Sequence, residues 1–165
     1  MRTLFRFALA LLFLAALPLA AQTGTWTAIP STGAIDESSL GAYNVSGPNL
    51  SHVAGSLTPI VARYNVTNTY GGGADDTPPW TRLELGYFDS SAAGSVTARL
   101  FRVDPCTGTP VLICNVPSVD SSVSTCEACS ITAGFDFSQY LYYVEVIVTR
   151  TSANVTPIAR TLRIY

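Results

Sequence analysis

Beyond residue 21, apolar residues recur at every second position, and no convincing run has helical spacing. Thr58–Val66, Trp80–Phe88 and Ser95–Val103 show this alternation most clearly. Because successive side chains of a strand point to opposite faces, each segment is predicted to be a strand with one apolar face. The residues expected on these apolar faces are Ile60, Ala62, Tyr64 and Val66, then Leu83, Leu85 and Tyr87, then Val96, Ala98 and Leu100.

Turn residues separate further segments of the same kind, about a dozen residues apart. Additional strands are predicted at Thr25–Ile29, Val111–Val116, Ser124–Ile131, Ile131–Phe137, Tyr140–Thr149 and Pro157–Tyr165, with shorter candidates at Ala42–Val45 and Asn49–Val53. Such spacing favours antiparallel pairing, because parallel strands need long crossover connections. The predicted fold class is an all-β antiparallel sandwich of about eight strands, jelly-roll-like. An immunoglobulin-like sandwich is the second choice, since Trp26 and Trp80 precede every cysteine.

One strand differs from the others. Tyr140–Thr149 is apolar on both faces except for Glu145 and Thr149. An apolar strand at a sheet edge is an aggregation hazard. This segment is therefore predicted to be a central strand, covered on both sides or partly covered by a loop.

The N-terminus has the three parts of a secretory signal peptide. Arg2 and Arg6 precede the apolar run Phe7–Leu17, and a small-residue cleavage site ends at Ala21. The apolar segment is too short for a membrane span, which needs roughly 20 residues. Residues 1–21 are predicted to be removed, and residues 22–165 to form one exported domain without a membrane span, extracellular or periplasmic.

The charged residues exclude several functions. The chain has no Lys, so lysine-based catalysis and a phosphate-loop lysine are ruled out. Seven Arg against eleven acidic residues give the mature chain a net charge of −4, which argues against nucleic-acid binding. His52 is the single histidine, and no G-x-S-x-G motif surrounds any serine. His52 is expected at the surface, and the chain is predicted not to be an enzyme.

The four cysteines, Cys106, Cys114, Cys126 and Cys129, lie within 24 residues. An even number in an exported chain predicts two disulfides, with a metal site or a redox motif as alternatives. If Val111–Val116 pairs with the strand ending at Ile131, the bonds are Cys114–Cys126 and Cys106–Cys129. The rival pairing is Cys106–Cys114 with Cys126–Cys129.

The segment Asn68–Pro79 is the longest irregular stretch and the first candidate for a binding loop. Tyr70 and Trp80 flank it and are candidate ligand-binding residues, since exposed aromatic rings can stack on sugars. Asp75 and Asp76 are candidate calcium ligands, although Asp also occurs in ordinary solvated turns. No other cofactor is expected.

These features favour a secreted, non-catalytic sandwich with a binding or structural role at the cell exterior, with carbohydrate or a protein surface as its partner. Two alternatives are a carbohydrate-binding module and a subunit of a surface fibre or pilus. In a fibre, Gln22–Pro30 would be donated to a neighbouring subunit. A further alternative is an exported hydrolase that uses His52 as its base.

Overall fold

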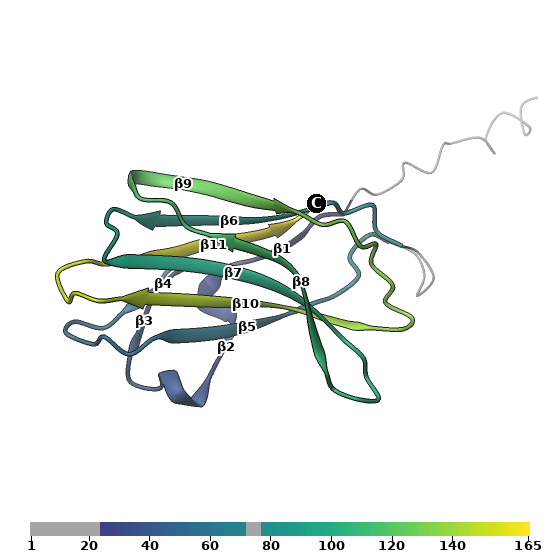
Figure 1. Cartoon of the computed structure of the whole chain (residues 1–165), viewed down its shortest axis with the longest axis horizontal. Coiled ribbons are helices and arrows are strands. Elements are labelled where there is room, and N and C mark those ends of the chain that lie inside the picture. The colour runs from purple at the N-terminus through teal and green to yellow at the C-terminus, as the bar shows by residue number, and fades with distance from the viewer. Residues whose placement is uncertain (1–23, 72–76) are drawn as a thin grey trace, which may run out of the picture.

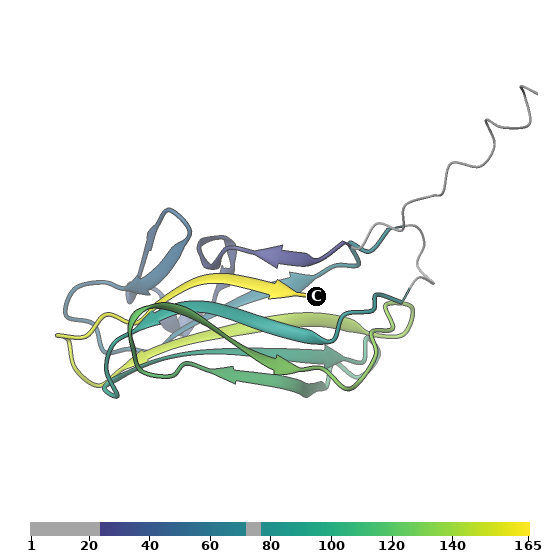
Figure 2. The same cartoon turned by 90° about the horizontal axis from the view of Figure 1, so that it is seen from above.

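A computed structural model of the chain describes residues 24–71 and 77–165. These residues form two antiparallel sheets packed face to face, with strands and short 3-10 turns and no α-helix among them (Figure 1). Figure 2 shows the two layers from above, with β1 and β11 toward the upper side of the picture and β7 and β8 toward its lower side. The predicted antiparallel β-sandwich is confirmed. The predicted signal peptide, residues 1–21, lies outside the described residues.

The sheets are named A and B. Sheet A has the order β3 (Tyr43–Ser46), β4 (Asn49–His52), β11 (Ile158–Ile164), β6 (Arg82–Asp89) and β9 (Ser121–Ser130), and β1 (Trp26–Ala28) also pairs with β11. Sheet B has the order β2 (Ala34–Ile35), β5 (Ile60–Val66), β10 (Leu141–Arg150), β7 (Gly94–Val103) and β8 (Pro110–Pro117). Two 3-10 turns, η2 (Pro30–Thr32) and η3 (Glu37–Ser39), flank β2.

The strands from β4 to β11 are paired in a nested way: β4 with β11, β5 with β10, β6 with β9, and β7 with β8. Such pairing arises when one long hairpin, with its turn between β7 and β8, is rolled into two sheets. Sheet A then contains β4, β11, β6 and β9, and sheet B contains β5, β10, β7 and β8. This is the eight-strand order of a jelly roll.

The core lies between the inner faces of the two sheets. The three strands with the clearest alternation bury the residues predicted for their apolar faces, from Ile60 in β5 to Leu100 in β7. In β11 a bulge between Ala159 and Thr161 shifts the register. Ala159 is therefore buried, and Ile158, which strict alternation with Leu162 and Ile164 would place in the core, is only half-buried.

The strand β1 belongs to this chain's own sandwich. It pairs with β11 through Trp26, Thr27 and Ala28, and the ring of Trp26 is buried in the core. The described part of the segment that would be donated in a fibre, residues 24–30, thus contributes a strand to sheet A of the same molecule.

Two predicted local structures are wrong. β9 does not pair with β8, because the chain crosses from sheet B to sheet A between Pro117 and Ser121. Ser118 fixes this crossing: its Oγ donates to Asp89 Oδ2 at 2.6 Å and accepts from the Val96 amide at 2.9 Å. The segment Ile131–Phe137 is a loop, because its aromatic side chains turn inward and close one end of the sandwich.

The disulfide of this structure joins the two sheets. Cys114 in β8 is bonded to Cys129 in β9, with their Cα atoms 6.1 Å apart, and Cys106 and Cys126 are exposed free thiols. The prediction of two disulfides and both predicted pairings are therefore wrong. The reason is the crossing after Pro117, which places β8 and β9 at facing edges of different sheets, so that Cys129 rather than Cys126 points inward toward Cys114.

Candidate functional site

The predicted central strand is central, since β10 lies between β5 and β7. However, no third layer of the described chain covers its outer face (Figure 2). Tyr143, Glu145 and Ile147 on this face are half-buried by their neighbours in the sheet. The apolar residues on the outer face of this strand are therefore part of an accessible surface, which we call the sheet B face.

Charged side chains cross the sheet B face in one row. The register places Arg63 of β5 opposite Glu145 of β10, Glu145 opposite Arg99 of β7, and Arg99 opposite Asn115 of β8. These four residues are the ionic row. Because directly opposed residues on one face of a sheet have their Cβ atoms about 5 Å apart, their side chains meet.

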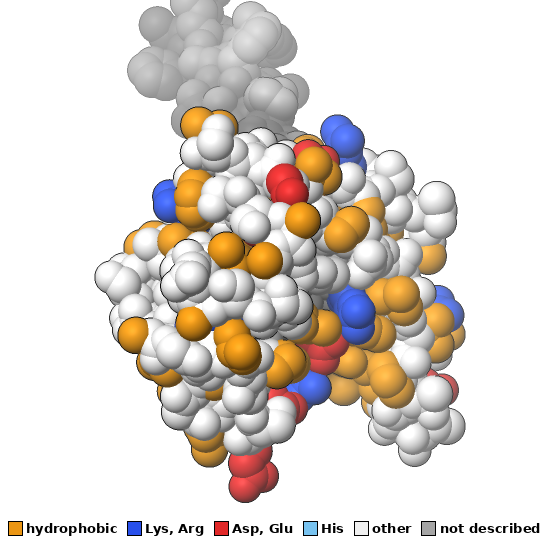
Figure 3. All heavy atoms as spheres, turned by 60° about the vertical axis from the view of Figure 1, so that its left-hand side comes forward, with side chains coloured by type: hydrophobic (Ala, Val, Ile, Leu, Met, Phe, Trp, Pro, Cys, Tyr) orange, Lys and Arg blue, Asp and Glu red, His pale blue; other side chains and the backbone are white. Residues whose placement is uncertain are grey.

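Glu145 is the centre of the ionic row. Arg63 Nη2 lies 3.0 Å from Glu145 Oε2, and Arg99 Nη1 lies 3.9 Å from Oε1. Arg63 also donates from Nη1 to Asp36 Oδ2 at 2.7 Å, which extends the chain of charges to the loop before η3. Figure 3 shows basic and acidic side chains next to one another in a hollow of the surface, with hydrophobic side chains beside them.

A second row, toward the β7–β8 hairpin, is aromatic and apolar. Tyr143 is opposite Phe101, with their rings stacked at 5.0 Å between centroids and 15° between planes. Asn65 of β5 lies on the far side of Tyr143, and Leu112 of β8 on the far side of Phe101. These four residues are the aromatic row. Leu112 is 52% exposed, so the row ends in open apolar surface.

Three side chains of the sheet B face have shifted pKa values. Hydrogen bonds from the Ser38 hydroxyl, then from Arg63, lower the pKa of Asp36 to about 2. The hydrogen bond with Asp36, and then that with Glu145, raises the pKa of Arg63. Burial, followed by the charge of Glu145, raises the pKa of Tyr143. Near neutral pH the face therefore offers guanidinium donors, carboxylate acceptors and a neutral phenol beside an apolar surface.

The residues predicted to bind a ligand lie at the end of the sandwich. Tyr70 and Trp80 line a small pocket of about 150 Å³ with Pro79 and Tyr165. Trp80 is only 4% exposed, and its Nε1 donates to the Gly24 carbonyl at 2.7 Å. Its ring has no free face on which a sugar could stack. Ligand binding by this pair stays a prediction.

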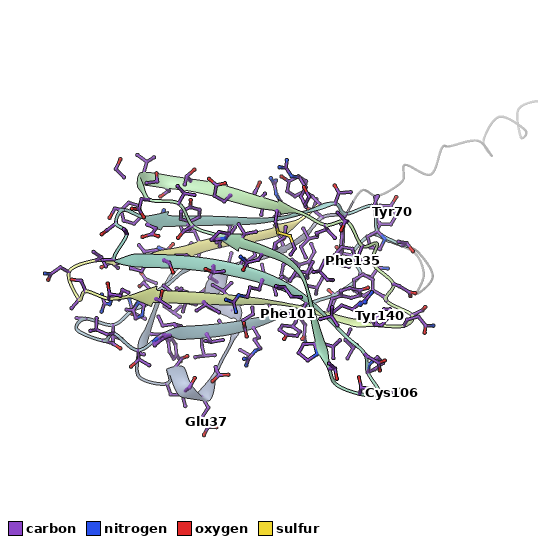
Figure 4. The ribbon with its side chains drawn as sticks, viewed as in Figure 1. Glu37, Tyr70, Phe101, Cys106, Phe135 and Tyr140 are labelled. Atoms are coloured by element: carbon purple, nitrogen blue, oxygen red, sulfur yellow. A yellow bond between two sulfur atoms is a disulfide. The ribbon has the colours of Figure 1, made fainter. Side chains whose placement is uncertain are left out.

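The ring of Trp80 packs instead in an aromatic cluster. Its centroid is 5.2 Å from that of Phe135, at an edge-to-face angle of 80°, and Phe135 lies 4.8 Å from Tyr142. Phe137 stacks on Phe135 at 5.7 Å. Figure 4 shows Tyr70, Phe135 and Tyr140 at this end, and Cys106 at the tip of the β7–β8 hairpin.

The calcium candidates Asp75 and Asp76 lie outside the described residues. Among residues 24–71 and 77–165, no group of three or more His, Cys, Asp or Glu side chains could hold a metal ion. None of the helical segments in this part of the chain could cross a membrane.

The prediction that His52 lies at the surface is wrong. It is buried in β4, with Nε2 3.0 Å from the Thr58 carbonyl oxygen, and its Nδ1 has no partner within the described chain. Burial, and then the charge of Arg150, lowers the pKa of His52. Arg150 is itself buried and donates to the carbonyls of Val53, Ser56, Ala153 and Val155, so it holds two loops together. His52 belongs to this structural cluster.

The sequence alone did not bring Arg63, Arg99, Phe101 and Tyr143 together as a site. Each lies within a predicted strand, but which strands are neighbours could not be predicted. The one available signal was the strand at Tyr140–Thr149, whose second apolar face has a single acid, Glu145, at its centre.

No family model matches the chain, and no curated protein sequence matches it. Among solved structures, the chain is similar to the C-terminal family 22 carbohydrate-binding module of Clostridium thermocellum Xyn10B. The TM-score is 0.38 at 14% identity, covering 89% of this chain and 96% of that one. A Clostridium thermocellum Xyn10B structure of CBM22-1 and GH10 modules with xylohexaose also matches with a TM-score of 0.38, at 10% identity. That match covers 85% of this chain and 24% of the other, longer chain.

A chain from infectious bursal disease virus, Gx strain, gives a TM-score of 0.36 at 11% identity, covering 86% of this chain and 31% of that one. A carbohydrate-binding module and a virus protein are thus almost equally similar to this chain. The similarity does not identify a ligand.

Proposed function

We propose that this chain is a secreted carbohydrate-binding protein, and that the sheet B face binds a neutral polysaccharide. The observation that carries the proposal is that an aromatic row and an ionic row lie next to each other on one uncovered face. Sugar rings present apolar C–H faces and polar hydroxyl edges, so a ligand of this class needs both kinds of surface side by side.

The ionic row suits hydroxyl groups rather than a charged ligand. Taken together with Asp36, the row has no net charge, because Arg63 and Arg99 are balanced by Glu145 and Asp36. A hydroxyl can accept from a guanidinium and donate to a carboxylate at once. An anionic ligand would meet Glu145 at the centre of the row, and a cationic one would meet arginines on both sides of it.

The width of the sheet matches an extended chain. The ionic row crosses four strands, β5, β10, β7 and β8, and β2 continues the sheet beside β5. With neighbouring strands about 4.8 Å apart, five strands span roughly 19 Å. A polysaccharide lying across the strands would follow the boundary between the two rows and contact several side chains.

Export is supported by the inter-sheet disulfide. Structural disulfides persist in oxidising compartments and are rare in the cytosol. The bond between Cys114 and Cys129 and the predicted signal peptide both support binding at the cell exterior.

The test is retention on insoluble cellulose, xylan and chitin, followed by calorimetry with soluble fragments of the retained polymer. We expect Tyr143→Ala to weaken binding about tenfold, since an aromatic contact contributes about 1.4 kcal/mol. Phe88→Ala is the matched control, because Phe88 is a half-buried aromatic on the outer face of sheet A. Retention on none of the polymers, or full binding by Tyr143→Ala, would contradict the proposal.

A further inference from the structure

A cleft of about 570 Å³ opens on the outer face of sheet A, on the opposite side of the sandwich from the sheet B face. One wall comes from β1 and η2, with Thr27, Ile29 and Thr32. The other wall comes from β6 and β11, with Glu84, Thr161 and Arg163. We call it the sheet A cleft.

The cleft exists because strand pairing along β11 is interrupted. β4 pairs with β11 only at Ile158 and Ala159, and β1 pairs with it only from Leu162 onward. Between these two contacts, Thr161 has no strand neighbour on that side of β11. On the other side of Thr161 lies Gly86, where a Cβ atom would collide with the Thr161 hydroxyl.

An ion pair provides the polar centre of the cleft. Arg163 Nη2 is 3.0 Å from Glu84 Oε1, and the Tyr165 hydroxyl donates to Glu84 Oε2 at 3.2 Å. The Arg163 guanidinium also lies over the Tyr165 ring, 4.4 Å from its centroid, which fixes its plane. The side chain of Arg163 remains 46% exposed, so N–H groups other than those facing Glu84 are accessible to a ligand.

Three threonine hydroxyls and the apolar side chain of Ile29 also line the cleft. Thr32 Oγ1 donates to the Ile29 carbonyl at 2.9 Å, which leaves its oxygen free to accept. Thr27 and Thr161 are exposed, and the Ile29 side chain is 44% exposed on the same wall. The cleft therefore combines a neutral ion pair, hydroxyl groups and an apolar patch that one sugar ring could cover.

We propose that the sheet A cleft is a second carbohydrate site, which takes a neutral sugar unit or a chain end. The ligand class rests on the function proposed for the sheet B face, whereas the site stands on its own geometry. Two sites on opposite faces of one sandwich cannot bind the same short fragment. The protein would then join separate polysaccharide chains, and its retention on a polymer would exceed the affinity of either site.

The test is calorimetric titration of the whole protein with xylohexaose and cellohexaose. The cleft variant is Glu84→Met with Arg163→Met, which removes both charges together and leaves no unpaired ion. Arg82→Met is the matched control, because Arg82 is an exposed arginine on the same face that does not line the cleft. We expect two sites in the unaltered protein and in Arg82→Met, one site in the cleft variant, and in Tyr143→Ala one unchanged site and one that binds about tenfold more weakly.

A cleft variant that binds two fragments as the unaltered protein does would overturn the second site and leave the proposed function intact. Loss of one site in the cleft variant, with no change in Tyr143→Ala, would support the cleft and contradict the sheet B face. If the cleft variant unfolds, Thr27→Trp fills the cleft from an exposed position and must remove the same site. Cross-linking of long soluble xylan should require both sites, and cross-linking by the cleft variant would also overturn the inference.

Discussion

The outer faces of the two sheets share a common arrangement of charged residues but differ in how their strands are paired. Each face has a carboxylate near its centre, Glu145 in sheet B and Glu84 in sheet A, paired with arginine from a neighbouring strand. Sheet B keeps its strands paired across the whole face, so its surface is made of side-chain rows. Sheet A interrupts the pairing beside Thr161, so its surface has a cleft. A binding surface can thus come from side-chain alternation or from strand topology.

The largest effect on stability is expected from removing the disulfide that links the two sheets. Replacing Cys114 and Cys129 by Ala should lower the free energy of unfolding by about 3 kcal/mol, because the bond closes a loop of 15 residues. Urea denaturation under non-reducing conditions measures this. The control is Cys106→Ala with Cys126→Ala, which removes two free thiols and should change stability little. Equal effects of the two double variants would contradict the assigned pairing.

The next largest effect on stability is expected from removing the central carboxylates, Glu145 of sheet B and Glu84 of sheet A. Glu145→Ala should destabilise by about 1–2 kcal/mol, because the carboxylate is only 13% exposed and its loss leaves Arg63 and Arg99 facing each other. Glu84→Ala should cost about 0.5 kcal/mol, since Arg163 keeps its contact with Tyr165. Urea denaturation of both variants compares the faces directly. A larger loss of stability in Glu84→Ala than in Glu145→Ala would contradict this prediction.

Mild acid should lower the stability of the folded protein through His52 in β4 of sheet A. Its pKa is lowered in the folded protein by burial, and then by Arg150, so the unfolded chain binds the proton more readily. Stability should therefore be full above pH 6.5 and fall as the pH drops below that value. Thermal melts between pH 8 and pH 5 test this, with His52→Gln as the control that should flatten the change in that range. A melting temperature of the unaltered protein that rises on acidification would contradict it.

The smallest effect is expected at Asp36 on the sheet B side. Its pKa of about 2 lies below the ordinary value of 3.8, so its pair with Arg63 is stabilising above pH 3.8. That contribution should disappear as the pH falls toward 2. The melting temperatures of the unaltered protein and Asp36→Asn should then converge between pH 5 and pH 2. A difference that persists at pH 2 would show that the charge of Asp36 does not matter.

Much of the fold follows from the sequence because strand faces depend on local alternation. The inner residues of β5, β6 and β7 could be predicted since one buried face dictates their register. The partners of each strand could not, because a jelly roll pairs segments as distant as β4 and β11. The predicted cysteine pairings were wrong for the same reason, because β8 and β9 are consecutive in the chain but lie in different sheets.

The candidate site was less predictable than the fold. Phe101 and Tyr143 meet because β7 and β10 are neighbours, although 42 positions in the chain separate the two residues. Trp80 was predicted as a candidate ligand-binding residue because it flanks a Gly- and Pro-rich loop. Its burial depends on the packing of Phe135, which comes from a different loop. Only the doubly apolar strand around Glu145 indicated the sheet B face in advance.

The most direct test of the sheet B face is an NMR titration of the unaltered protein with soluble fragments of a polysaccharide that retains it. The account predicts that the side-chain signals of Tyr143 and Phe101 shift, with the same concentration dependence as the guanidinium signals of Arg63 and Arg99. Binding of the fragments that leaves all four residues unchanged would show that the ligand binds elsewhere, and would contradict the central claim.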